Sequence, residues 1–181
     1  RSRDLVVDVS DVRDSTGSTL YTLGQSSSNA TVTVRGVYNC NRCLRALLRY
    51  AKNATAVVRD VSSCSGSFDD ALASAVDSAV AVENVRDDIG GFHSLASRAI
   101  GTAVTVGNAQ NITGAFSYTG MFTHTTSYVF ADVSDVESSF ASSLMGANGC
   151  SFALSGASRW VNSAESFAFI LSHSENSSFS F

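Results

Sequence analysis

Hydrophobic and polar residues alternate along several stretches of the chain. In DLVVDVSDV (4–12), TVTVRGVY (31–38) and TAVVRDV (55–61), β-branched residues recur at every second position. This period is typical of a strand with one buried face. Later segments combine similar residues with glycine at their ends. We therefore predict strands in the first three segments and also at 99–107, 114–120, 127–133, 151–161 and 166–173.

Three other segments change to a helical period. Residues 43–51 carry apolar residues at i, i+3, i+4 and i+7, and residues 67–84 begin with Ser67 three residues before Asp70, as a capping box does. Residues 134–144 begin in the same way and repeat an apolar residue every four positions. The expected buried faces of these three helices are Leu44, Leu47, Leu48 and Ala51; Leu72, Val76, Ala79 and Val80; and Val136, Phe140 and Leu144.

The order of these elements favours one fold class. We predict an α+β domain, with a mainly antiparallel sheet and about three helices packed on one face. A chain of 181 residues suits a single domain, which we place at 1–174 with a C-terminal tail at 175–181. The pentapeptide DVSDV occurs at 8–12 and at 132–136, but the two contexts differ, so we do not interpret it as an internal repeat.

The composition limits the possible partners. The net charge is −4, and Lys52 is the single lysine among scattered arginines, which argues against nucleic acid as a partner. The chain lacks an apolar run long enough to span a membrane. Charged residues make up only 15% of the chain, a low share for a solitary domain. We therefore predict protein neighbours in a homo- or hetero-oligomeric assembly.

Sequons and cysteines indicate the compartment. Candidate N-glycosylation sites are Asn29, Asn53, Asn111 and Asn176. Four cysteines in a serine-rich chain suit an oxidising compartment, so we predict a secreted or surface-displayed protein with structural disulfides. Three pairings are possible, and the sequence leaves them open. The disulfide candidates are Cys40, Cys43, Cys64 and Cys150.

Cys40 and Cys43 also offer redox chemistry. They lie between a predicted strand and a predicted helix, where helix-terminal amides would stabilise a thiolate. The segment 31–61, with its order of strand, CxxC, helix and strand, resembles thioredoxin-like and glutaredoxin-like proteins. The resemblance implies that Cys40 is the attacking thiol and Cys43 the resolving one. The cis-proline of those proteins has no counterpart, because this chain contains no proline.

Other chemical sites find little support in the sequence. A four-cysteine zinc site usually needs two closely spaced pairs, and Cys64 and Cys150 are far apart. Asp8, Asp11 and Asp14 are spaced by three but belong to no calcium loop. The motifs HExxH, GxSxG and GxGxxG are absent. We therefore predict no metal, no cofactor and no catalytic residue.

Together these patterns favour a non-enzymatic protein. Our first prediction is a structural or interaction subunit of an extracellular or virion-type assembly, stapled by disulfides and a candidate for N-glycosylation. The alternative is a secreted thiol-disulfide oxidoreductase that uses Cys40 and Cys43. A carbohydrate- or protein-binding module that reads its ligand with exposed aromatic residues is also compatible with the sequence.

Overall fold

The computed structural model describes residues 2–17, 20, 22–114, 116–137, 143–161 and 172–181. These ranges contain strands and turns, and they contain no helix that could cross a membrane. All the strands belong to one sheet. They are β1 (Val6–Arg13), β2 (Thr31–Tyr38), β3 (Thr55–Ser62), β4 (Ala79–Ile89), β5 (Ala103–Thr113), β6 (Ser127–Glu137), β7 (Ser151–Ser155), β8 (Ser158–Val161) and β9 (Ser178–Ser180).

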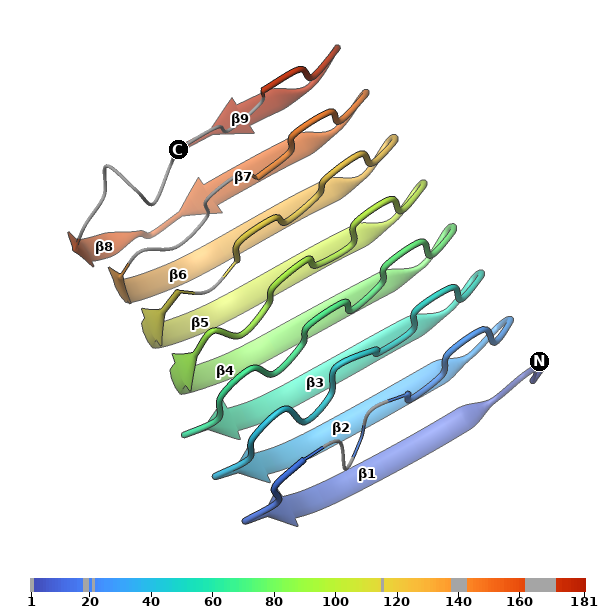
Figure 1. Cartoon of the computed structure of the whole chain (residues 1–181), viewed down its shortest axis with the longest axis vertical. Helices are drawn as coiled ribbons and strands as arrows, with labels where there is room; N and C mark the ends of the chain where they lie inside the picture. The colour runs from blue at the N-terminus through green and yellow to red at the C-terminus, as the bar shows by residue number, and fades with distance from the viewer. Residues whose placement is uncertain (1, 18–19, 21, 115, 138–142, 162–171) are drawn as a thin grey trace.

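The strands stack in parallel, and from β2 to β7 they do so at a fixed interval of sequence. Thr31 of β2 lies opposite Thr55 of β3, which lies opposite Ala79 of β4, and partners across these strands are 24 residues apart. After β2, β3 and β4 the chain runs back along one side of the sheet before the next strand begins, as Figure 1 shows. We call this return the return segment, and a strand with its return segment a coil. The chain is therefore a β-solenoid.

The return segments are hydrogen-bonded from coil to coil, as the strands are. The amide of Leu72 donates to the carbonyl of Leu47 at 2.9 Å, and the amide of Ala96 donates to the carbonyl of Ala71 at 2.7 Å. Strand and turn amides are thus both used between coils. A proline lacks this donor and would leave a neighbouring carbonyl unpaired, which gives the absence of proline a structural reason.

Asparagine and aspartate make the corners of the coils. Asp14 and Asn39 directly follow β1 and β2, while Asp87, Asn111 and Asp135 lie near the ends of β4, β5 and β6, and all five have φ between 49° and 55°. Among residues with a side chain, these two types tolerate the left-handed conformation best. They also bond between coils, since Nδ2 of Asn39 donates to Oδ1 of Asp14 at 2.6 Å. The recurring Asp and Asn residues are therefore corner residues.

The core lies between the sheet and the return segments. The strands contribute inward valines such as Val34 and Val82, which are fully buried. The return segments contribute a stack of phenylalanines, with ring centroids 4.5 Å apart for Phe68 and Phe92 and 4.7 Å apart for Phe92 and Phe116. Burial of each such side chain stabilises the fold by roughly 1.5–3 kcal/mol, so successive coils are joined mainly through this interior.

The predicted α+β fold is wrong. In the expected helix at 43–51, Leu44 and Leu48 are buried, but their φ angles are 58° and 54°, which no right-handed helix contains. The expected helix at 67–84 ends inside β4, and the one at 134–144 begins inside β6 and runs into 138–142, outside the described residues. The sheet is parallel rather than antiparallel. The tight turns bring an apolar side chain into the core every three or four residues, and this spacing is the same as that of a buried helix face.

Several predicted strands are confirmed. Residues 31–38 form β2 and residues 55–61 lie within β3. The strand predicted at 114–120 is part of a return segment instead, and most of 166–173 lies outside the described residues. The segment 175–181, expected to be a tail, carries β9, which pairs with β7.

Candidate binding face

The side of the sheet that points away from the core is the most regular surface of the molecule. At the first and third positions of β2 to β7 and of β9, every outward side chain is Thr, Ser, Ala or Val, and each is exposed or partly exposed. We call these residues the outer face. They are Thr31, Thr33, Thr55, Val57, Ala79, Ala81, Ala103, Thr105, Ser127, Val129, Ser151, Ala153, Ser178 and Ser180.

The register of the sheet aligns these residues in two straight rows. Ala81 pairs with Thr105, and Thr105 pairs with Val129, while Ala103 continues the other row. Neighbouring strands are about 4.8 Å apart, and residues two positions apart on one strand are separated by about 7 Å. The outer face is therefore a two-dimensional grid of methyl and hydroxyl groups.

Charged residues border the outer face without entering it. Asp8 of β1 pairs with Thr33 at one end of a row. Arg59 and Glu83 are the next outward residues after the grid on β3 and β4, and Nε of Arg59 lies 2.9 Å from Oε2 of Glu83. Solvated sheet faces normally mix charges of both signs. The outer face differs from this norm, because it is uncharged and made of small residues.

The outer face is also held rigid. Its side chains are short or β-branched, so they have few rotamers to lose on binding. A ladder at the strand corners ties the coils together, with Nδ2 of Asn84 donating to Oδ1 of Asp60 and Nδ2 of Asn108 donating to Oδ1 of Asn84, both at 2.9 Å. A pre-organised surface of this kind pays little conformational entropy when it binds.

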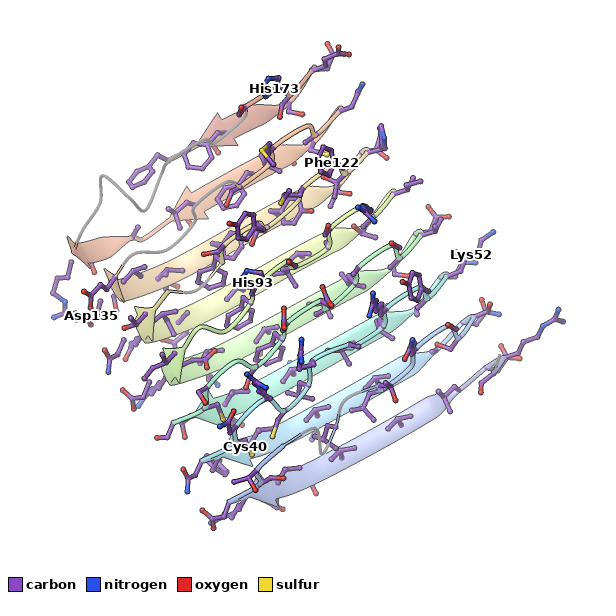
Figure 2. All side chains as sticks on the ribbon, viewed as in Figure 1. Cys40, Lys52, His93, Phe122, Asp135 and His173 are labelled. Carbon is purple, nitrogen blue, oxygen red and sulfur yellow. The ribbon has the colours of Figure 1, made fainter. Side chains whose placement is uncertain are left out.

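The cysteines do not form the predicted staples. All four are free thiols buried in the solenoid, with at most 3% of any residue exposed. Cys40 and Cys64 occupy the same place in successive coils, and each thiol donates to the carbonyl two residues earlier, at 3.4 Å to Tyr38 and 3.2 Å to Ser62. Figure 2 shows Cys40 near the carboxyl end of β2. The predicted disulfide bonds are therefore wrong.

The oxidoreductase alternative is wrong for a related reason. It required Cys40 and Cys43 at the start of a helix and a thiol of low pKa, and residues 43–50 form turns instead. Burial raises the pKa of Cys43 to about 12 and the pKa of Cys64 to about 11. A buried thiol whose thiolate is disfavoured is a poor nucleophile.

We expect the four cysteines to resist alkylation in the folded protein. Iodoacetamide at about pH 8 should label them at least a thousandfold more slowly than in urea, because labelling needs local opening of the coil. Mass spectrometry of the modified protein measures this. The variant Thr55→Cys, on the outer face, is the matched control and should label rapidly. Labelling of native Cys40 at the rate of that control would contradict the burial.

Cys150 belongs to a structural row as well. Ser78, Thr102, Thr126 and Cys150 occupy the same place in successive coils, and the side chains of Ser78, Thr126 and Cys150 each donate to the carbonyl two residues earlier, at 2.8, 3.1 and 3.4 Å. Serine and threonine make such local bonds readily. Cys150 therefore replaces a hydroxyl residue in a turn and has no redox partner there.

The sequon asparagines are corner residues too. Nδ2 of Asn29 donates to Asp4 at 3.1 Å and Nδ2 of Asn111 donates to Asp87 at 2.6 Å. Asn53 and Asn176 have φ of 51° and 48°, as corner residues do. A glycan on these nitrogens would enter rows whose members are about 4.8 Å apart. The predicted glycoprotein is therefore wrong. The prediction of a disulfide-stapled subunit of an extracellular or virion-type assembly is also wrong, because it depended on disulfides, glycans and an α+β domain.

Sequence reasoning missed the outer face. Each of its residues is ordinary when considered alone, and only the register brings them together. The available signal was the pair of buried residues two apart that recurs every 24 positions. These pairs are Val32 and Val34, Ala56 and Val58, Val80 and Val82, and Val104 and Val106. In the described part of the chain, no group of three or more His, Cys, Asp or Glu residues is arranged to hold a metal ion.

Comparison with known proteins gives weak likenesses. No protein-family model and no curated protein matches the sequence. The chain is similar to two structures of QnrB1, a plasmid-mediated fluoroquinolone resistance protein. The trypsin-treated form is 11% identical over 90% of this chain and 93% of that chain, with a TM-score of 0.23. The full-length form is 12% identical over 91% and 95%, with a TM-score of 0.19. These values are too low to transfer a fold or a function from QnrB1 to this chain.

Proposed function

We propose that the protein binds ice through the outer face. The observation that carries this proposal is the uncharged, in-register grid of Thr, Ser, Ala and Val side chains over seven strands of one sheet. The proposal also places the protein outside the cell, secreted or displayed at the surface, where it meets external ice.

The grid suits ordered water. Threonine and serine hydroxyls each donate and accept hydrogen bonds, so they can anchor individual water molecules. Methyl groups between them restrict the orientation of the water that covers them. Because the strands repeat at about 4.8 Å and the two rows are about 7 Å apart, the anchored water inherits a regular spacing comparable to the repeats of hexagonal ice. Charged side chains would impose other water orientations, and the grid has none.

A small-molecule ligand fits this face poorly. Ligand sites are usually concave and combine apolar walls with a few convergent polar groups. Four pockets in the described ranges lie elsewhere, at the carboxyl ends of the strands and on the return segments. The outer face contributes no residue to the linings of these four pockets. A flat, extended partner is therefore the better match.

Measurement of thermal hysteresis tests the proposal. The protein should lower the freezing point of ice crystals below their melting point and should slow recrystallisation. Replacing Thr105 with lysine should reduce the hysteresis about tenfold or more, because a lysine in the contact must lose its hydration. Thr105 is exposed and lies in the middle of the face, between Ala81 and Val129.

The variant Ile100→Lys is the matched control. Ile100 is 46% exposed on the return side, in a row that already contains Lys52 two coils away. The Ile100→Lys variant should keep the full thermal hysteresis of the unmodified protein. The proposal fails if the unmodified protein has no thermal hysteresis, or if Thr105→Lys and Ile100→Lys reduce the hysteresis equally. It also fails if the protein dimerises through the outer face and Thr105→Lys merely yields monomers.

A further inference from the structure

Glycines on the return side leave a groove along the solenoid. Gly66, Gly90 and Gly114 occupy the same place in successive coils, with φ of 59°, 65° and 63°. A Cβ added at Gly90 or Gly114 would meet no atom within 4 Å, so the floor of the groove is open. The groove has a volume of about 360 Å³, and its remaining lining residues are Arg42, Arg45, Asp69 and His93.

One carboxylate holds two cationic side chains at the wall of this groove. Oδ2 of Asp69 lies 2.6 Å from Nη2 of Arg45, and Oδ1 lies 3.4 Å from Nδ1 of His93. The three residues occupy the same place in successive coils. Nδ1 of His93 is also 3.0 Å from Oγ of Ser94, and the ring lies edge-on to Tyr118 with the centroids 5.1 Å apart. Figure 2 labels His93 midway along the stack of coils.

The charges around the groove do not balance. The hydrogen bond to Asp69 raises the pKa of His93, and the hydrogen bond to His93 together with Arg45 lowers the pKa of Asp69. Asp69 thus contacts two cations, while Asp70, which also faces His93, lies 3.8 Å from Arg49. Arg42 adds a third cation, since its Cγ lies 3.3 Å from the position that a Cβ on Gly66 would take. Among the residues that the structure describes, no carboxylate lies within ion-pair distance of Arg42.

We propose that this groove binds a tetrahedral oxyanion, either a sulfate or a phosphate group. Guanidinium groups present parallel donors that match the oxygens of such groups, and an imidazolium adds a further charged donor. The side chains are the donors here, because the amides of Gly66 and Gly90 already donate to Ile89 and Thr113. A local positive groove on a chain of net charge −4 would also attract anions to this one place.

The open floor leaves room for the group that carries the oxyanion. With no side chain on Gly90 and Gly114, a sugar ring or a similar ester could lie along the groove while its sulfate or phosphate contacts Arg42 and His93. The groove lies on the return side and contributes nothing to the outer face. The inference is therefore independent of ice binding.

Calorimetric titration with sodium sulfate tests this inference. Ionic strength is held constant with sodium chloride, because exposed charges are screened by salt. Sulfate keeps both charges at pH 6 and at pH 8, so a change in affinity reports on the protein. We expect saturable binding that weakens severalfold from about pH 6 to about pH 8 as His93 loses its proton. The groups that face His93 are Asp69, Asp70, Arg45 and Tyr118.

Matched variants separate the groove from general attraction. Arg42→Gln should weaken sulfate binding about tenfold, the value of one charge-assisted hydrogen bond. Arg98→Gln is the control, because Arg98 is also an exposed arginine with φ of 57° but does not line the groove. His93→Gln should remove the pH dependence. Titration with glucose 6-sulfate distinguishes a preference for an ester, shown by tighter binding, from a preference for the free ion, and either result supports the site.

Two outcomes would overturn the inference. One is sulfate binding that does not saturate, which means an adventitious ion only. The other is an equal loss of affinity in Arg42→Gln and Arg98→Gln, which means that only the overall charge matters. Thermal hysteresis in the same variants should stay unchanged, so failure here and failure of ice binding remain distinguishable.

Discussion

Replacing Asp88 with valine should stabilise the protein at pH 8 by roughly 4 kcal/mol, since a pKa raised by about three units corresponds to this free energy. Asp88 is completely buried, and neither carboxylate oxygen has a hydrogen-bond partner among the described residues. Burial raises its pKa from 3.8 to about 7. Ile112 and Val136 occupy the same place in the next two coils, so valine suits this position.

The sign of the pH dependence follows from the raised pKa. Between about pH 4 and about pH 7, the folded protein keeps the proton of Asp88 while the unfolded chain has lost it. The free energy of unfolding should therefore fall as the pH rises through this window and stay low above it. His93, whose pKa is also raised, contributes in the same direction. A variant that removes only the Asp88 carboxylate is needed to separate the two groups.

Urea unfolding at pH 5 and pH 8 measures the effect. The variant Asp88→Asn keeps the shape of the side chain and cannot ionise, so the difference between it and the unmodified protein isolates the titration of Asp88. Asp88→Val should in addition remove the unpaired polar atoms and be the most stable of the three at pH 8. Our account is wrong if the unmodified protein and Asp88→Asn share the same pH dependence, or if Asp88→Val is the least stable.

Replacing Phe92 with alanine should destabilise the protein by about 3–5 kcal/mol, the usual effect of truncating a buried phenylalanine. Phe92 is fully buried, and its ring stacks on Phe68 at an interplanar angle of 7° and on Phe116 at 19°. The change removes both contacts at once. Because each coil touches only its neighbours, we also expect the coils before and after this one to unfold in separate transitions.

Phe92→Leu is the control for this experiment. Leu44 occupies the same place two coils earlier, with φ of 58° against 59° for Phe92, so leucine suits the local backbone. It should restore most of the lost stability and a single transition. Circular dichroism during urea unfolding and amide hydrogen exchange would both detect a split transition. An unchanged midpoint in Phe92→Ala would show that the aromatic stack does not join the coils.

The sequence predicts part of this fold correctly and part wrongly for identifiable reasons. Alternation identifies β2 and β3 because their inward valines meet a single core face. It fails at Leu44 and Leu48, where left-handed turns bury residues four apart, as a helix would. The two copies of DVSDV do not occupy equivalent places, since Asp8 is the third residue of β1 whereas Asp132 is the sixth residue of β6.

The candidate site was harder to predict than the strands. A threonine such as Thr33 or Thr105 has no chemical signature of its own, and both become part of a surface only through pairing across several coils. The cysteines drew attention instead, because CxxC has a known chemistry. Their burial in the core, with Cys43 fully covered, depends on the solenoid and not on local sequence.

The equal spacing of the coils also determines how such a molecule can change in length. Inserting one residue at the start of β4, before Val80, would turn Val80 and Val82 outward and break the alignment with β3 and β5. Duplicating a whole unit of 24 residues would leave every existing contact in place and extend the grid by one more rung. Gene duplication in steps of one coil is therefore a route by which a lineage can enlarge this surface gradually, without redesigning any part of it.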